Sequence, residues 1–445
     1  MSVTKQFFKY VSQSILGTLG VSCYVIADTF FIAREAGTNG ITVLNLALPL
    51  YNLIFAIGAM MGIGGATRFA VLRAQRNKEA EGYFSNSLFF LGILSIVFVL
   101  VGIFFPAQVL TIMGADKQIM ELGIEYFRIF LLFTPFFMMN YVFTAFIRND
   151  GDPALAMVAT VVSSLSNVVF DYIFMFPMGM GLAGAALATA ASPIISICIC
   201  SLHFLKKTNT IKFRLGRPRR GMTVRSCQLG VPALVSELSS GMTTMVFNFI
   251  ILTIAGNIGV AAYGVVANFA IVAVAIFNGI SQGAQPLISR HYGIGDEKST
   301  HRLLSLGIGS AVVISIVIYG VVFLFAEQLV GLFNSEQNME MAQYALQGMR
   351  LYFTGFIFAG FNMVVCGYFS ATERATGSFI VSIIRGIIGI VAFAFILSGL
   401  FGFCGVWMSF PVTEAVTSVI AVSFLVCYIK RRSGHSRSVT MGGRV

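Results

Sequence analysis

The chain has 445 residues, of which 57% are hydrophobic and only 11% are charged, and its mean hydropathy is +0.86. Soluble domains carry about 25% charged residues, so this composition excludes a water-soluble globular protein and predicts one embedded in a membrane. The formal net charge of +11 does not indicate nucleic-acid binding, because the basic residues cluster in short hydrophilic breaks between apolar runs.

Cysteine usage and motif content also exclude several classes of protein. The seven cysteines lie in or beside apolar runs without paired CxxC spacing, so we expect neither a disulfide framework nor a zinc site. We find no metalloprotease motif, nucleophile elbow or phosphate-binding loop in a suitable context. The sequence therefore predicts that the protein is not an enzyme and needs no cofactor beyond a coupling ion.

Apolar runs of about 20 residues, the length of a transmembrane helix, recur about twelve times. In chain order they are 11–34, 40–67, 85–111, 120–147, 154–176, 181–205, 228–254, 258–288, 303–326, 342–369, 377–399 and 404–429. This pattern predicts an all-α integral membrane protein with 12 transmembrane helices. An even number of crossings places both termini on the same side of the bilayer.

The basic residues between these runs indicate which side that is. One side of the bilayer collects most of the basic residues and the longest hydrophilic break, KKTNTIKFRLGRPRRGMTVR. The other basic residues on this side are Lys5, Lys9, Arg68, Arg73, Arg76, Lys78, Arg148, Arg290, Lys298, Arg302, Arg374 and 430–432. The other side holds little beyond Arg34 and Lys117, plus Arg128 and Arg350 near segment ends. The positive-inside rule therefore predicts cytoplasmic termini and a cytoplasmic linker.

The linker separates two halves that resemble each other. A shift of 219 residues places Gly37, Gly40 and Gly64 on Gly256, Gly259 and Gly283. Because six crossings per half is an even number, we expect two six-helix bundles related by a pseudo-twofold axis along the membrane normal, with the substrate path between them. The predicted organisation is an N-terminal bundle (1–205), a basic linker (206–226), a C-terminal bundle (227–430) and a cytoplasmic tail (431–445).

Polar residues inside the apolar runs of the first half are candidates for an ion site. The stretch SNVVFDYIF contains Asn167 and Asp171 one helical turn apart, while Asp28 and Thr189 lie in other segments. At 1.5 Å per residue, Asp28, Asp171 and Thr189 fall at one depth in the outer half of the bilayer. The alternative is that each residue only fixes helix packing.

Two carboxylates at one depth favour an ion site over packing. A charge inside the bilayer costs about 2.5–3.5 kcal/mol on insertion scales, and two facing carboxylates cannot both stay ionised cheaply. One carboxylate would bind a proton, or both would share a cation. Carboxylate, amide and hydroxyl oxygens suit Na⁺, so a sodium site at Asp28, Asn167, Asp171 and Thr189 stays open beside a proton site.

The second half lacks these acids and has its own charged residues. Glu237, Arg385 and Glu414 all lie within apolar runs. They can form an internal ion pair, of Arg385 with Glu237 or Glu414, or take part in binding a cationic substrate. Uncharged polar lining is expected from Asn268, Gln282 and Asn362.

The chain resembles the multidrug and toxic compound extrusion (MATE) transporters. The stretches that carry this resemblance are SNVVFDYIF, ADTFFI, FIRNDGDPALAM, GMGLAGAALAT and GISQGAQPLISRHYG. The likeness covers nearly the whole chain and is strongest to the prokaryotic DinF-like and MepA-like branch. It implies the MATE fold and a coupling-ion site at Asp28, Asn167, Asp171 and Thr189, with Tyr24 beside it. It further implies a protein of the bacterial cytoplasmic membrane that exports lipophilic, often cationic drugs by H⁺ or Na⁺ antiport. We expect a monomer, because the two halves of the chain already supply both bundles.

Two departures from the family pattern limit what the resemblance implies. Some relatives have a proline in the first segment, where this chain reads VSQSILG, so bending at proline does not carry over. Glu237 is offset from the C-terminal acids of another branch, so their role is not transferred to it. The alternative function is flipping of a lipid-linked oligosaccharide, although Arg385 is the one basic residue well inside a segment.

Overall fold

The computed structural model describes residues 2–214, 218–333 and 338–441, and most of these residues are helical. The first half contains α1 (Val3–Ala74), α2 (Ala80–Phe104), α3 (Pro106–Ile112), α4 (Lys117–Leu132), α5 (Thr134–Asn149), α6 (Pro153–Met175), α7 (Gly181–Ser201) and η1 (Leu202–Leu205). The second half contains α8 (Arg220–Gly293), α9 (Glu297–Leu324), α10 (Ala326–Gly331), α11 (Met339–Tyr352), η2 (Phe353–Gly355), α12 (Phe356–Ala371), α13 (Ala375–Ile383), η3 (Ile384–Ile388) and α14 (Gly389–Met441).

The helices are long and apolar enough to cross a membrane many times. Among the described residues, nine helices pass this test, or ten when α4 and α5, which meet at a 45° bend, count as one span. Every apolar run of the sequence corresponds to a single helix, to one side of a kinked helix or to two or three consecutive helical elements. The described part of the chain contains no strand, and the predicted all-α membrane fold is confirmed.

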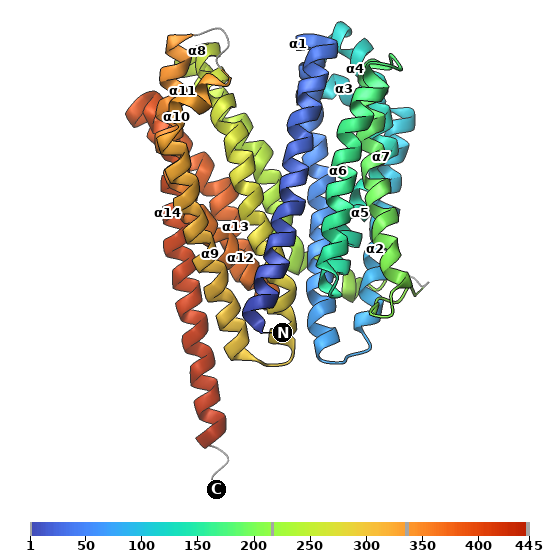
Figure 1. The fold of residues 1–445 in the computed structure, drawn as a ribbon, viewed down its shortest axis with the longest axis vertical. Coiled ribbons are helices and arrows are strands. Elements are labelled where there is room, and N and C mark those ends of the chain that lie inside the picture. Colours follow the sequence, from blue (N-terminus) through green and yellow to red (C-terminus); the bar gives the residue numbers. More distant parts are fainter. Residues whose placement is uncertain (1, 215–217, 334–337, 442–445) are drawn as a thin grey trace.

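Glycine kinks divide the longest helices. Gly37 (φ 58°, ψ −145°), Gly256 (φ 60°, ψ −156°) and Gly402 (φ 58°, ψ −136°) interrupt α1, α8 and α14. This backbone region is essentially restricted to glycine. Gly37 and Gly256 are the pair related by the 219-residue shift, so both halves of the chain bend at the same place. In Figure 1 the two parts of α1 run side by side in opposite directions.

We expect a substitution at such a kink to destabilise the fold. Gly256→Ala forces a side chain into a region that costs about 1–3 kcal/mol, so its thermal midpoint falls. The matched control is Gly264→Ala in the same helix, where a new Cβ would meet no atom within 4 Å and alanine stabilises a helix by about 0.5–1 kcal/mol. Thermal unfolding of the purified variants in detergent measures the midpoint of each. Equal midpoints for Gly256→Ala and Gly264→Ala would contradict the strain argument.

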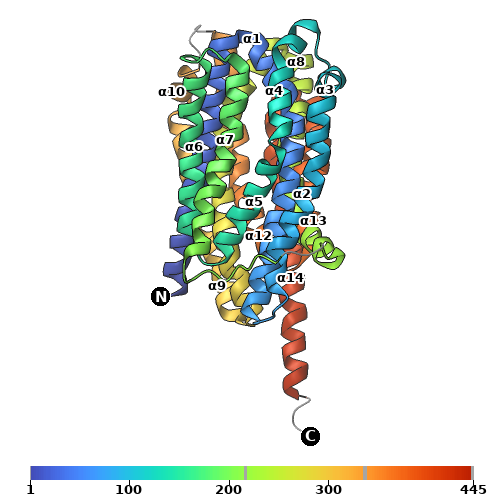
Figure 2. The same cartoon turned by 90° about the vertical axis from the view of Figure 1, so that its right-hand side faces the viewer.

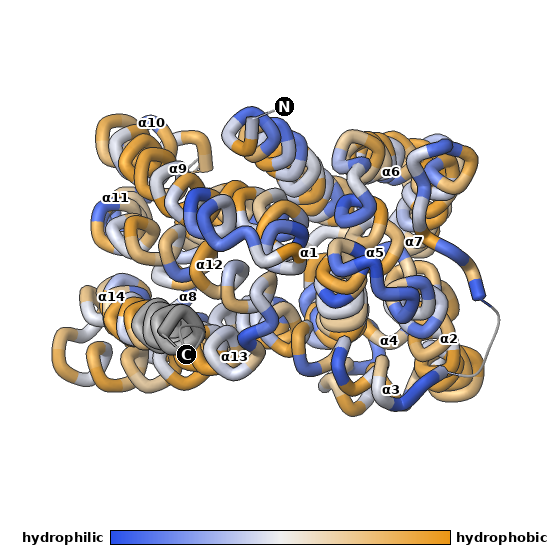
Figure 3. The backbone as a smooth tube through the Cα atoms, turned by 90° about the horizontal axis from the view of Figure 1, so that it is seen from below, coloured by the Kyte–Doolittle hydropathy of each residue, from blue (hydrophilic) through white to orange (hydrophobic). Residues whose placement is uncertain are grey.

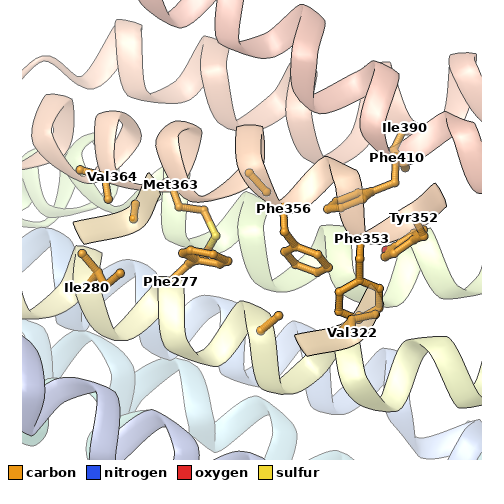
Figure 4. Packing of buried hydrophobic residues seen from close by; sticks show 14 of the residues in the cluster. Phe277, Ile280, Val322, Tyr352, Phe353, Phe356, Met363, Val364, Ile390 and Phe410 are labelled. Carbon is orange, nitrogen blue, oxygen red and sulfur yellow. The ribbon is translucent and has the colours of Figure 1, made fainter. Parts of the chain in front are cut away.

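Each half builds its own hydrophobic core. The core of the first half includes Tyr126, Phe127 and Phe130, and that of the second half is rich in aromatic rings. Figure 4 shows Phe277, Ile280, Val322, Tyr352, Phe353, Phe356, Met363, Val364, Ile390 and Phe410 in the second core. Figure 1 shows two bundles standing side by side, and Figure 2 views the molecule from the side of the first bundle, with α6 and α7 toward the viewer. Phe7 and Val11, at the start of α1, pack into the core of the second bundle.

The bundles meet at the end that carries the N-terminus and diverge toward the opposite end (Figure 1). Seen from that end in Figure 3, hydrophilic segments gather near the labels of α1, α5 and α12. Two repeat-related glycines lie at the contact. A Cβ on Gly64 would stand 2.0 Å from the Ser226 carbonyl oxygen, and one on Gly283 would stand 2.7 Å from the Val11 Cα. Such small residues allow the close approach of helix backbones in membranes.

Polar contacts reinforce this junction. Arg68 of α1 donates to both carboxylate oxygens of Glu373, at 2.7 and 2.9 Å. Gln285 of α8 donates to the Thr67 hydroxyl at 2.6 Å, and the Thr18 hydroxyl donates to the Ala275 carbonyl oxygen at 2.8 Å. The described contacts therefore hold the two bundles together at one end of the molecule.

The basic linker is attached to the first bundle. Lys212 lies 2.8 Å from Glu81 of α2, and Arg214 pairs with the same carboxylate. The backbone N–H of Arg219 donates to Asn86 at 2.6 Å, and Ile211 is buried in the first core. Residues 215–217 and 442–445, within the predicted linker and tail, lie outside the described residues.

Candidate functional site

The predicted acid pair forms between α1 and α6. Asp28 is 8% exposed and Asp171 is fully buried. Their carboxyl groups lie within hydrogen-bonding reach of each other. In the described residues, the Oδ1 atoms of both aspartates are buried without a hydrogen-bond partner. The structure therefore brings together two acids that lie far apart in the sequence. Their carboxylate oxygens have fewer hydrogen-bond donors than they can accept from.

Asn167 and Thr189 complete the polar set. Asn167 precedes Asp171 by four residues, so both lie on one face of α6, and Asn167 is fully buried. In one amide orientation its Nδ2 donates to the Thr189 hydroxyl at 3.4 Å. The hydrogen-bond network favours the other orientation, in which Asn167 donates to Asp171 Oδ2 at 3.2 Å and accepts from the Thr189 backbone N–H at 3.3 Å. Asn167 thus links α6 to α7.

Three tyrosines surround the acids, and sequence reasoning missed two of them. Tyr24, one turn before Asp28, lies within electrostatic range of both aspartates. Tyr51 and Tyr126 join their hydroxyl groups at 3.1 Å and lie within range of Asp28. The sequence gives no signal for this pair, because a tyrosine in an apolar helix looks like any other core residue.

The chemistry of this cluster suits a small cation. Two carboxylates in a low-dielectric interior repel each other strongly unless a proton or a cation lies between them. The amide and hydroxyl oxygens of Asn167 and Thr189 are additional ligands for a hard cation. A proton or a small cation bound at the cluster would therefore change the electrostatic energy of the contact between α1 and α6.

The second bundle contains a buried ion pair. Arg385 Nε donates to Glu414 Oε1 at 2.6 Å, and Glu414 is 1% exposed. Asn362 donates to Glu414 Oε2 at 2.7 Å and to the Glu414 carbonyl oxygen at 2.8 Å. Arg385 lies in η3, a single π-helical turn, a feature often found at functional sites. Of the two predicted partners of Arg385, the structure selects Glu414.

Glu237 stands apart from that pair. It lies on α8, partly exposed, within electrostatic range of Tyr24 and Tyr141 of the first bundle. The described residues provide no ion-pair or hydrogen-bond partner for its side chain. Glu237 is therefore an unpaired acid where the second bundle faces the first.

The three uncharged residues that were predicted to line the substrate path, Asn268, Gln282 and Asn362, do not lie together. Asn268 is partly buried on α8. Gln282 accepts from Arg148 Nη1 at 2.7 Å, so it belongs to the junction between the bundles and not to the surroundings of Glu237. Asn362 belongs to the ion pair of the second bundle. The structure thus distributes these three residues over separate environments.

A further acidic cluster lies at the end where the bundles meet. Asp150 is 3% exposed, with Arg73 at 2.6 Å and His203 Nε2 at 2.7 Å. His203 Nδ1 lies 3.2 Å from Asp152. Partial burial alone would raise the pKa of Asp152, but hydrogen bonds from Lys206, His203 and the Leu155 N–H lower it below the ordinary value. This cluster joins α1, the turn before α6 and the end of η1.

Comparisons with known proteins agree with this architecture. The MatE family model matches residues 14–173 and 232–396. The chain is 26% identical over 434 residues to multidrug export protein MepA of Staphylococcus saprophyticus, covering 97% of this chain and 94% of that protein. A MepA protein of Staphylococcus aureus is 27% identical over 435 residues, with coverage of 96% and 94%.

Solved structures with the same fold include two transporters. A MOP superfamily transporter from Pyrococcus furiosus superposes with a TM-score of 0.89 at 24% identity, covering 97% of this chain and 96% of the other. An outward-facing multidrug resistance MATE family transporter superposes with a TM-score of 0.88 at 23% identity, covering 97% of both chains. The resemblance drawn from the motifs is confirmed, and the family model, which matches both bundles, shows that this chain belongs to the MatE family of multi-pass membrane proteins.

Proposed function

We propose that this protein is a secondary active transporter that exports lipophilic, often cationic compounds in exchange for H⁺ or Na⁺. The observation that carries the proposal is the buried Asp28–Asp171 pair, whose energy depends on a bound cation. The MepA relatives, which carry the name multidrug export protein, support export of drugs. Transport accounts for the buried polar clusters of the described residues, and the relatives that the chain matches are named as export proteins and not as enzymes.

The orientation follows from the basic residues. The end where the bundles meet carries Arg73, Arg76, Arg290 and the linker, so we assign it to the cytoplasm. The Staphylococcus relatives favour the cytoplasmic membrane of a bacterium as the location. With that assignment, the bundles are closed toward the cytoplasm and diverge toward the outside. This arrangement corresponds to the outward-facing state of an alternating-access cycle.

The coupling step would take place in the first bundle. A proton or Na⁺ from outside binds between Asp28 and Asp171 and removes the repulsion between the carboxylates. Closer packing of α1 against α6 then favours release of the drug outward and return to the inward-facing state. The bound ion must have different affinities in the two states, because only differential binding shifts a conformational equilibrium. One chain supplies both bundles, so we expect the transporter to be a monomer.

Glu237 is the proposed contact for the cationic part of a substrate. Its carboxylate is unpaired and lies within electrostatic range of the phenol groups of Tyr24 and Tyr141, and carboxylates and aromatic ring faces both attract organic cations. We expect Glu237→Gln to raise KM for a cationic dye by about tenfold, the equivalent of about 1.4 kcal/mol. Transport of a neutral lipophilic dye serves as the control and should be unchanged. Equal loss for both dyes would contradict charge recognition.

The proposal as a whole is tested in proteoliposomes loaded with a fluorescent cationic dye. A pH gradient alone and then a sodium gradient alone are imposed on wild type and on Asp171→Asn. Dye movement under one gradient, lost in the variant, supports antiport and identifies the ion. Absence of movement under both gradients would overturn it and favour the flippase alternative, which is tested next with a lipid-linked sugar. That alternative is disfavoured because Glu414 neutralises Arg385, the basic residue placed to meet a diphosphate.

A further inference from the structure

A cavity with polar lining lies between the bundles, at the end that we assign to the cytoplasm. Its volume is about 340 Å³, and its lining includes Tyr10, Arg73, Arg76, Asn149, Asp150 and Arg290. Arg73 and Arg76 come from the end of α1 and the turn after it, in the first bundle. Arg290 comes from the end of α8, in the second bundle. The cavity is therefore built by both bundles and is distinct from the acid pair.

The charges around this cavity do not balance. Three guanidinium groups and one carboxylate, that of Asp150, line the cavity, and Asp150 is contacted by Arg73 at 2.6 Å and by His203 at 2.7 Å. Neither Arg76 nor Arg290 has an ion-pair partner in the part of the chain that the structure describes. Both side chains are exposed, so water reduces the repulsion between the like charges that line the cavity but leaves an energetic cost. An anion bound in the cavity would remove this cost.

Backbone strain at Arg76 provides an independent observation. After α1 ends, the Asn77 N–H bonds the Leu72 carbonyl and the Arg76 N–H bonds the Arg73 carbonyl, which is the Schellman pattern. Arg76 occupies its left-handed position with φ of 56°. Glycine normally fills this position, because the left-handed region costs other residues of the order of 1 kcal/mol or more.

The second half of the chain shows the unstrained version of the same turn. The 219-residue shift places Arg76 on Gly295, whose φ is 77°. There the Asp296 N–H bonds the His291 carbonyl, and the Gly295 N–H bonds the Tyr292 carbonyl. The fold thus accepts glycine at this turn, whereas the first half carries a strained arginine on the wall of the cavity. Strain at a ligand-facing residue is a pointer to function.

We propose that this cavity binds a phosphate-bearing anion, either free phosphate or the headgroup of an anionic lipid, and thereby clamps the two bundles together. The guanidinium fork of arginine matches phosphate oxygens with two parallel hydrogen bonds. Because Arg73 and Arg76 come from one bundle and Arg290 from the other, the complete site exists only while the bundles meet. The anion therefore stabilises the state closed toward the cytoplasm. The binding itself does not depend on the proposed transport function, while its effect on the cycle does.

The binding test compares two sources of phosphate. In one arm, the thermal midpoint of the detergent-purified protein is titrated with inorganic phosphate against chloride at equal ionic strength. In the other arm, midpoints are compared in phosphatidylcholine nanodiscs with and without phosphatidylglycerol. A saturable rise with inorganic phosphate identifies free phosphate as the ligand, and a rise only with phosphatidylglycerol identifies the headgroup. No rise in either arm overturns the proposal.

Matched variants separate this cavity from general surface charge. Arg290→Gln removes the guanidinium group of the second bundle. Arg76→Gly removes one of the two guanidinium groups of the first bundle while relieving strain, so this variant is expected to fold. Each should weaken the apparent affinity about tenfold or more, the loss expected for one charge-assisted hydrogen bond. The control is Arg302→Gln, an exposed arginine of α9 outside the cavity. An equal effect of Arg302→Gln would overturn the assignment to the cavity.

The clamp is tested separately by distance measurement. Spin labels at positions 207 and 298, exposed lysines of the two bundles, are introduced into a chain without native cysteines. We expect the identified anion to increase the population with the short distance, and Arg290→Gln to abolish that increase. Binding without a change in the distance distribution would overturn the clamp. These outcomes do not involve dye transport, so they are independent of whether the proposed antiport holds.

Discussion

Asp28→Asn and Asp171→Asn are each expected to reduce gradient-driven dye efflux to the level of protein-free liposomes, while the protein stays folded. Each substitution removes one of two buried carboxylates that face each other. The remaining acid then has no facing charge for a cation to neutralise, so binding of the ion no longer changes the packing of α1 against α6. Removing one carboxylate also relieves repulsion, and the thermal midpoint should therefore not fall. Proteoliposome efflux and thermal unfolding measure the two effects.

The double variant shows whether the two acids act as one unit. We expect Asp28→Asn combined with Asp171→Asn to be no worse than either single variant, since residues that act together are strongly non-additive. Glu125→Gln is the matched control, because Glu125 is an exposed acid of α4 that pairs with Arg128 at 2.7 Å. It should leave efflux unchanged. Full efflux by either aspartate variant, or a further additive loss in the double variant, would contradict a shared ion site.

Breaking the buried ion pair of the second bundle should cause the largest loss of stability. Glu414 has 2% of its side chain exposed and Arg385 has 18%. Removal of one partner leaves the other charge buried and uncompensated, which costs about 3–5 kcal/mol. We therefore expect Arg385→Gln and Glu414→Gln each to lower the thermal midpoint markedly.

The paired replacement separates stability from function. Arg385→Met together with Glu414→Leu removes both charges and should recover most of the lost stability, because hydrophobic replacement of a buried pair is often neutral or stabilising. Asn362 then loses its carboxylate acceptor, so recovery is expected to be incomplete. A double variant as unstable as the single variants would show that the pair fixes the π-helical turn at η3 by more than charge compensation.

The sequence identified membrane crossings and candidate site residues wherever a residue type is energetically unusual for the stretch in which it lies. Apolar runs mark the crossings because lipid accepts few charges, and for the same reason Asp28, Asp171 and Glu414 stand out individually. The repeat was visible because Gly37 and Gly256 occupy a backbone conformation that other residues rarely adopt. These signals are local, so each can be recognised without knowledge of the partner.

Partnerships between helices were decided by the tertiary structure alone. The sequence left Arg385 with two possible partners, and helix packing joined it to Glu414. It gave no sign that Tyr51 and Tyr126 meet beside the acids, since a tyrosine in an apolar helix is indistinguishable from core filler. The arginine-lined cavity was also hidden, because Arg76 and Arg290 read as ordinary positive-inside residues. By itself, the sequence determined which residues are costly in a membrane. The rotation and approach of helices distant in the chain determined which of those residues face one another, because contact energies depend on geometry that no local pattern encodes.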